Sequence, residues 1–158
     1  MKLTDIIQQG SIVADLETSD RDEAIKELVN KLVDTGVASA DIRDDLIARV
    51  LDRERKHSTG FGRGVAVPHV KHPDIDTMAA AIGISKSGLD FNSLDKQPVF
   101  TIFLLLSPQS KPEEHLQAME VIFKNLSKED FRKELQQANS AEDIYKHLDD
   151  ADNHRVVG

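Results

Sequence analysis

The 158 residues of this chain include no cysteine. The side chains that could carry chemistry are therefore its histidines, carboxylates and hydroxyls. That absence excludes disulfides, thiolate nucleophiles and cysteine-ligated zinc. His69 is the most informative of the six histidines, since it directly follows a short apolar segment that ends in Pro68. Ligands of α/β sheets bind just beyond the carboxyl ends of strands, so we predict a functional imidazole here. A histidine without a task, at the start of a polar loop, would give the same pattern.

His115 is expected in the first turn of a helix that begins near Pro112. It shares a helix face with Met119, Ile122 and Leu126, so its ring is predicted to point inward. The positive end of the helix dipole disfavours an imidazolium, which favours a neutral ring hydrogen-bonded to a neighbour. A histidine at the edge of the core, satisfied by backbone groups, explains the spacing equally well.

Two arginines, Arg49 and Arg53, extend the apolar stripe of Ile42 and Leu46. The pattern therefore predicts cations on the core side of a helix end, just before the glycine-rich loop STGFGRG at 58–64. Such glycines permit close approach of backbone to a ligand. Their spacing is neither the dinucleotide nor the Walker pattern, and a tight connection is the alternative. Arginines on helices also commonly extend their charged ends to solvent.

A zinc site formed by histidines is a weaker alternative. His57, His69, His72 and His115 lack the H-E-x-x-H spacing of helical zinc sites, and Lys71 would repel a cation. No G-x-S-x-G segment is present for a serine nucleophile. A metal-dependent hydrolase is therefore kept only as a third hypothesis, and we expect no metal.

The elements that would position these residues alternate between helices and strands. Apolar stripes predict helices over Leu3–Gln8, from a Ser19 cap to Gly36 and from a Ser39 cap to Lys56. A further helix is predicted from Pro112 onward, and two short helices after caps at Ser127 and Ser140. The predicted buried stripe of the helix at Pro112 consists of Leu116, Met119, Ile122, Phe123 and Leu126. Apolar runs predict buried strands at 11–16, 64–68, 78–85 and 99–107. This alternation predicts one α/β domain over 1–150, with a central sheet flanked by helices on both faces and a loose tail at 151–158.

Composition narrows the classes of function. Twenty basic and 28 acidic residues give a formal charge of −8, which argues against a general binder of nucleic acid or anionic membranes. The first residues do not resemble a signal peptide, and no run of 18 apolar residues occurs. We expect a cytoplasmic protein.

Three segments together resemble a known family. They are RE at 53–54, STGFGRGVAVPH at 58–69 and EEHL at 113–116. They are similar to the fructose/mannitol class of IIA domains of the bacterial phosphoenolpyruvate-dependent sugar phosphotransferase system, including its nitrogen-regulatory branch. The resemblance extends from the first predicted helix to about Leu148, with an arginine 16 residues before the Pro-His pair and a histidine 46 after it. It implies a mixed sheet between helical layers.

The resemblance also implies roles for the candidate residues. His69 would accept a phosphoryl group from the phosphocarrier protein HPr and pass it to a IIB domain, so no cofactor beyond the covalent phosphoryl group is expected. His115 resembles the second active-site histidine of the family, and Arg53 resembles the arginine near the phosphoryl group. The predicted phosphoryl-binding loop contains Ser58, Thr59, Gly60, Gly62, Arg63 and Gly64.

Two positions depart from the family pattern. Arg63 stands where the family usually has asparagine, and Val70 stands where it usually has glycine. Neither change removes a group that the chemistry requires, but both bear on the identity of the partner. The leading hypothesis is a phosphocarrier, peripheral to a membrane permease at most. The alternative is a stand-alone regulator that binds target proteins according to its phosphorylation state.

Overall fold

A computed structural model describes residues 1–153 of the chain. The helices are α1 (Leu3–Ile6), α2 (Arg21–Asp34), α3 (Arg43–Lys56), α4 (Pro112–Leu126), α5 (Glu129–Gln137) and α6 (Ala141–Asp152). The strands are β1 (Ile12–Val13), β2 (Gly60–Gly62), β3 (Val65–Ala66), β4 (His69–His72), β5 (Ala79–Leu89) and β6 (Val99–Pro108). Within the described residues, no helix is long and apolar enough to cross a membrane.

The strands form one mixed sheet in the order β1-β5-β6-β3-β2, with β4 also paired to β6. The long strands β5 and β6 run antiparallel at its centre, whereas β3 and β4 both run parallel to β6. Val65 pairs with Thr101 and His69 with Leu105, so β3 and β4 lie one after the other along the same edge of β6. Pro68 interrupts this edge because it has no backbone N–H to donate.

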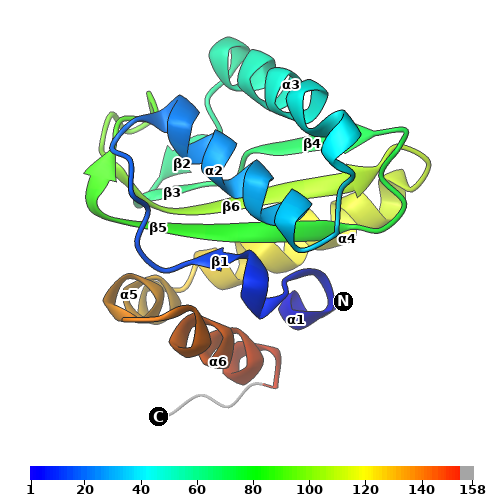
Figure 1. Cartoon of the computed structure of the whole chain (residues 1–158). Helices are drawn as coiled ribbons and strands as arrows, with labels where there is room; N and C mark the ends of the chain where they lie inside the picture. The colour runs from blue at the N-terminus through cyan, green and yellow to red at the C-terminus, as the bar shows by residue number, and fades with distance from the viewer. Residues whose placement is uncertain (154–158) are drawn as a thin grey trace.

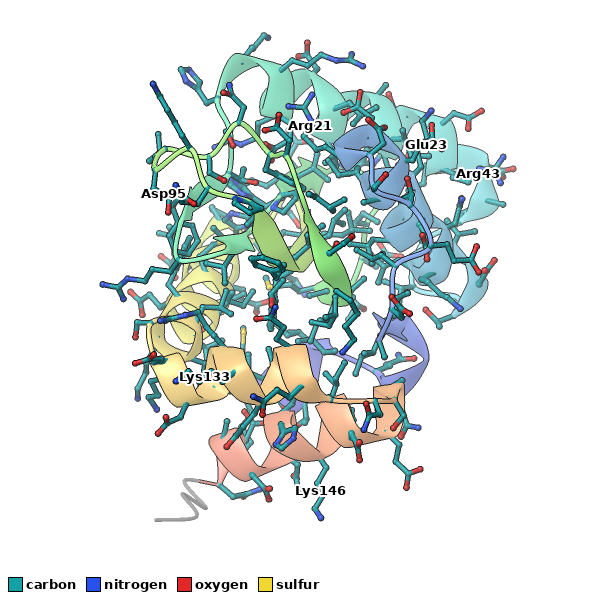
Figure 2. The ribbon with its side chains drawn as sticks, turned by 90° about the vertical axis from the view of Figure 1, so that its left-hand side faces the viewer. Arg21, Glu23, Arg43, Asp95, Lys133 and Lys146 are labelled. Carbon is teal, nitrogen blue, oxygen red and sulfur yellow. The ribbon has the colours of Figure 1, made fainter. Side chains whose placement is uncertain are left out.

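Helices cover both faces of the sheet, which confirms the predicted fold class (Figure 1). One face packs against α2 and α3, and the other against α1, α4, α5 and α6. Alternate residues of a strand point to opposite faces, so Leu104 and Leu106 join the first core and Leu105 joins the second. Charged side chains such as Arg43 and Lys133 lie on the outer surfaces of these two layers (Figure 2).

The ends of several elements differ from the sequence prediction. The helix predicted over Leu3–Gln8 ends at Ile6, and the strand predicted at 11–16 contains only Ile12–Val13. Asp20 rather than Ser19 caps α2, and Ser127 does not cap α5, whereas Ser140 caps α6 as predicted. The last helix includes Ala151 and Asp152, which the sequence analysis placed in the tail, and residues 154–158 lie outside the described part.

The stripe predicted for α4 is wrong at two positions. Leu116 is 63% exposed and Phe123 is 37% exposed, while Ala118 and Asn125 are buried. The buried face is therefore rotated relative to the apolar pattern. His115, Ile122 and Leu126 are buried together, as their spacing predicts.

Candidate functional site

His69 is the first residue of β4 and not the start of a polar loop, which corrects the sequence prediction. Its Nδ1 lies 2.8 Å from the Val67 carbonyl oxygen, two residues earlier. The Pro68 carbonyl accepts from the Leu105 amide of β6 at 2.9 Å, whereas the Val67 carbonyl accepts from the imidazole. Because a carbonyl can only accept, Nδ1 carries the proton of the neutral ring and Nε2 keeps its lone pair.

The surroundings of His69 favour its neutral, nucleophilic form. Burial lowers the pKa of His69 below its usual value of 6.5, and the charges of Arg53 and Lys71 lower it further. The hydrogen bond to Val67 acts in the opposite direction. At neutral pH the ring therefore presents an unprotonated Nε2.

His115 lies beside His69, with 5.5 Å between the ring centroids and 50° between the ring planes. It sits in the first turn of α4 and is only 5% exposed. Its Nδ1 lies 2.6 Å from the hydroxyl of Ser107, near the end of β6. Burial, followed by the charges of His69, Lys71 and Arg53, lowers the pKa of His115 from 6.5 to about 4.

Two cations act on both imidazoles. Arg53 is exposed in the last turn of α3, and Lys71 is exposed on β4. Neither side chain forms an ion pair within residues 1–153, so both charges remain available to an anion. Sequence reasoning missed Lys71 as a site residue, although its spacing from His69 on a strand places both side chains on one face.

Part of the predicted glycine-rich loop is a strand, because Gly60–Gly62 pairs antiparallel with β3. The loop also contacts α4: the Phe61 and Phe123 rings lie 4.7 Å apart, and an Arg63 guanidinium nitrogen lies 3.4 Å from the Ser127 carbonyl oxygen. Arg63 has a φ of 60°, the left-handed region that asparagine and glycine tolerate better. The loop is thus bound along the helix that carries His115.

The hydroxyls predicted in this loop donate within the fold. Ser58 donates to the Phe91 carbonyl oxygen at 2.6 Å and accepts from the Gly60 amide at 3.0 Å. Thr59 donates its amide to Glu54 Oε2 at 3.0 Å and its hydroxyl to Glu54 Oε1. Glu54 is 2% exposed, and burial raises its pKa above 4.5 while the two Thr59 donors oppose that change. The Thr59 contacts attach the loop to the end of α3, and the Ser58 hydroxyl attaches it to the segment after β5.

The strand separates two histidines that were considered as joint metal ligands. His72 lies three residues after His69 and points to the opposite face, where Nε2 lies 2.7 Å from Asp45 Oδ2. The amide of Asp74 donates to His72 Nδ1 at 3.0 Å. Among the described residues, no three histidine, aspartate or glutamate side chains are grouped as metal ligands.

The apolar stripe predicted Arg49 and Arg53 on the core side of α3. This prediction is wrong for both residues. Both are exposed, and Arg49 forms a surface ion pair with Asp45 at 2.9 Å. Long charged side chains on a helix can follow an apolar stripe and still reach solvent. For Arg53, exposure places the guanidinium at the surface close to the imidazoles.

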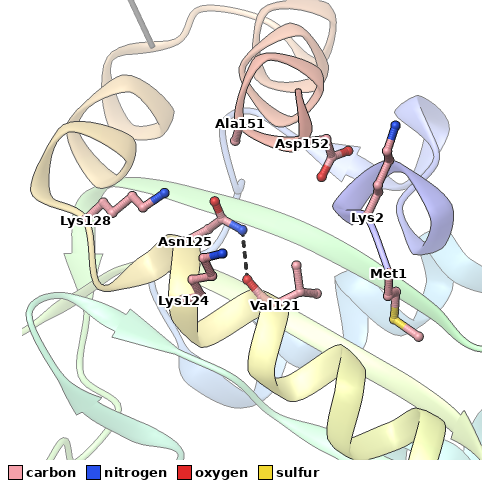
Figure 3. A pocket seen from close by; sticks show the side chains of 8 residues that line it. All are labelled: Met1, Lys2, Val121, Lys124, Asn125, Lys128, Ala151 and Asp152. Carbon is pink, nitrogen blue, oxygen red and sulfur yellow. Dashed lines mark hydrogen bonds between the residues drawn. The ribbon is translucent and has the colours of Figure 1, made fainter. Parts of the chain in front are cut away.

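A cavity of about 100 Å³ lies at the opposite end of α4 from His115 (Figure 3). Its lining includes Lys124, Lys128 and Asp152. The Asp152 carboxylate accepts from the backbone amides of Leu3 and Thr4 at 2.6 and 2.9 Å, so it caps α1 and ties α6 to the start of the chain. An anion in this cavity would face that carboxylate, and we assign the cavity no function.

The same fold occurs in the crystal structure of the nitrogen regulatory protein IIA-Ntr from Neisseria meningitidis. The TM-score is 0.81 at 28% sequence identity, and the match covers 91% of this chain and 97% of that one. Residues 5–151 match the family described as phosphoenolpyruvate-dependent sugar phosphotransferase system, EIIA 2. The chain belongs to this family.

Two curated relatives represent two branches of the family. A nitrogen regulatory protein of Bradyrhizobium diazoefficiens is 32% identical over 149 residues, covering 94% of this chain and 95% of the relative. The fructose-specific EIIABC component of Bacillus subtilis is 33% identical over 144 residues, covering 91% of this chain but only 22% of the relative. The chain therefore spans about a fifth of the fructose-specific relative.

Proposed function

We propose that this protein is a phosphocarrier that accepts a phosphoryl group on Nε2 of His69 from an HPr-like protein and transfers it to a IIB domain. The observation that carries the proposal is the position of His69. Its Nδ1–H is bound to Val67, its Nε2 has no hydrogen-bond partner among residues 1–153, and His115, Arg53 and Lys71 lie close enough to act on the ring. Membership of the sugar phosphotransferase family supports the same reaction.

The proposed transfer needs no cofactor, because one P–N bond is formed as another is broken. The lone pair of His69 Nε2 attacks phosphorus, and the P–N bond to the donor histidine breaks as the new P–N bond forms. His69 keeps its Nδ1 proton, which the Val67 carbonyl holds. Phosphoryl transfer passes through a loose transition state, so positioning and charge stabilisation contribute most of the catalysis. Arg53 and Lys71 supply positive charge beside the rings for the phosphoryl oxygens.

The test is phosphorylation with phosphoenolpyruvate, enzyme I and HPr, followed by phosphorus NMR. We expect one acid-labile phosphohistidine, bonded through Nε2, in the parent protein. His69→Ala should take up no phosphoryl group, whereas His147→Ala on α6 serves as the matched control and should react normally. Equal labelling of His69→Ala, or attachment through Nδ1, would contradict the proposal. The reaction would take place in the cytoplasm, where phosphoenolpyruvate is produced.

A regulatory role is the second candidate, and the similarity to nitrogen regulatory proteins favours it. A nitrogen regulatory protein of Bradyrhizobium diazoefficiens is 32% identical to this chain, about as similar as the fructose-specific relative at 33%. In this role the phosphorylated and unphosphorylated forms would bind a target protein with different affinity. Transfer of the phosphoryl group to a sugar-specific IIB domain would favour transport. Failure of that transfer, together with phosphorylation-dependent capture of a target, would favour regulation.

A further inference from the structure

The two facing imidazoles are held in the same way but by different chemical groups. Each Nδ1 has a partner in the fold, Val67 for His69 and Ser107 for His115. Neither Nε2 has a hydrogen-bond partner within residues 1–153. The chemistry available at each Nε2 therefore depends on which ring nitrogen carries the proton.

The tautomer of His69 is fixed with the proton on Nδ1, because the Val67 carbonyl can only accept a hydrogen bond. A serine hydroxyl, in contrast, can donate to an unprotonated Nδ1 or accept from a protonated one. The geometry of the 2.6 Å contact between Ser107 and His115 is compatible with both arrangements. The tautomer of His115 has to be decided by what else Ser107 can reach.

Ser107 has no alternative acceptor for its own proton. Its side chain is 0% exposed, and His115 Nδ1 is its one hydrogen-bond partner among the described residues. If Ser107 accepted from His115, its hydroxyl proton would be buried without a partner and would carry the full desolvation penalty. If Ser107 donates, the remaining donor is the Nε2–H of His115, and this atom is not among the fully buried polar atoms without a partner in the described residues. The hydroxyl therefore donates, and His115 Nδ1 accepts.

We propose that Ser107 is a positioning residue that fixes the Nε2–H tautomer of His115. His69 then offers a lone pair at Nε2, while His115 offers an N–H from the neighbouring ring. The low pKa of His115 is consistent with a neutral ring, for which the two tautomers are the alternatives. Resting on the proposed phosphocarrier function, the inference gives His115 a donor for an oxygen of the phosphoryl group on His69.

The sheet explains why a serine at this place can act on both histidines. Ser107 pairs with Lys71 in the parallel ladder, two residues beyond the pair of His69 with Leu105. Directly paired residues of neighbouring strands point to the same face, so Ser107 and His69 lie on the side that α4 covers. The Ser107 backbone belongs to a central strand that is paired on both sides, and the hydroxyl makes its printed contact with His115.

Nitrogen NMR of the unphosphorylated protein at pH 7 tests the tautomers without any partner protein. Long-range proton–nitrogen correlations should show the Nδ1–H form for His69 and the Nε2–H form for His115. Ser107→Ala should give a mixture of tautomers at His115, Ser107→Thr should restore the Nε2–H form, and His147 should be unchanged in both. An Nδ1–H form of His115 in the parent protein, or an unaltered tautomer in Ser107→Ala, would overturn the inference.

Kinetics separate this inference from the proposed function. A mixture of tautomers leaves the Nε2–H of His115 available in only part of the molecules, so phosphorylation of Ser107→Ala should slow by about two- to fivefold, with recovery in Ser107→Thr. If the parent protein shows the expected tautomers but is never phosphorylated, the proposed function fails and the structural role of Ser107 stands. If Ser107→Ala loses its tautomer but reacts at the parent rate, the donor role of His115 fails.

Discussion

Acid should destabilise this protein through His115, and substitution of that one residue should remove the effect. The pKa of His115 in the folded protein is about 4, against 6.5 for an unperturbed ring. Between these values the unfolded chain binds more protons than the folded one, so the free energy of unfolding falls as the pH falls. The contribution of His115 is complete above pH 6.5 and is lost as the pH drops toward 4.

The size of this contribution follows from the two pKa values. A full shift of that size corresponds to a stabilisation of about 3.4 kcal/mol. About 2.5 kcal/mol of this stabilisation is lost when the pH falls from 7.5 to 4.5. His115→Asn keeps an acceptor near the Nδ1 position for Ser107 but does not titrate. Urea unfolding at both pH values should therefore show the parent losing about 2.5 kcal/mol more than the variant.

Other titrating groups cancel in this comparison. The pKa of His69 is also lowered, which has the same sign, and the pKa of Glu54 is raised, which has the opposite sign. Both residues are present in the parent and in His115→Asn. Equal losses in the two proteins would refute a neutral, buried His115, and so would an NMR titration of this ring with a midpoint near pH 6.5.

Three further substitutions test the contacts around the site and at the chain ends. Glu54→Ala leaves both donors of Thr59 without an acceptor and should lower the free energy of unfolding by about 2–4 kcal/mol, whereas Glu54→Gln should cost less than about 1 kcal/mol. Arg63→Asn relieves a left-handed backbone and should raise stability by up to about 1 kcal/mol, measured by urea unfolding; a decrease would show that the Arg63 guanidinium contributes more than the backbone costs. Asp152→Ala removes the cap of α1 and should cost about 1–2 kcal/mol, with faster hydrogen exchange at the first amides of that helix; unchanged exchange would contradict the cap.

The buried position of His115 could be predicted from sequence because helix periodicity is a local signal. Its spacing to Ile122 and Leu126 places all three on one face, and all three are buried. The same reasoning failed for Leu116 and Phe123, since the sheet and α5 decide which part of a broad apolar face becomes covered. The local pattern predicts that a helix has an apolar face, whereas tertiary packing decides which residues of that face become buried.

The surroundings of His69 could not be predicted because they depend on pairing between distant segments. HVKH at 69–72 is short and polar, and Pro68 before it suggests the end of a strand. Only its ladder with Leu105–Pro108 makes this segment β4. That same ladder brings Ser107 within reach of His115, a contact that no spacing along the chain reveals.

The charges beside the two rings have effects that agree in sign. Arg53 and Lys71 lower the pKa of both imidazoles, so they favour the uncharged forms that a nucleophile and a neutral donor require. Under the proposed function, the same cations would attract a phosphoryl dianion bonded to His69. A carboxylate in their place would raise both pKa values and repel the phosphoryl group. The net charge of −8 does not reveal this positive local charge. The pKa values of the two rings depend on the few charged groups beside them and not on the charge of the whole chain.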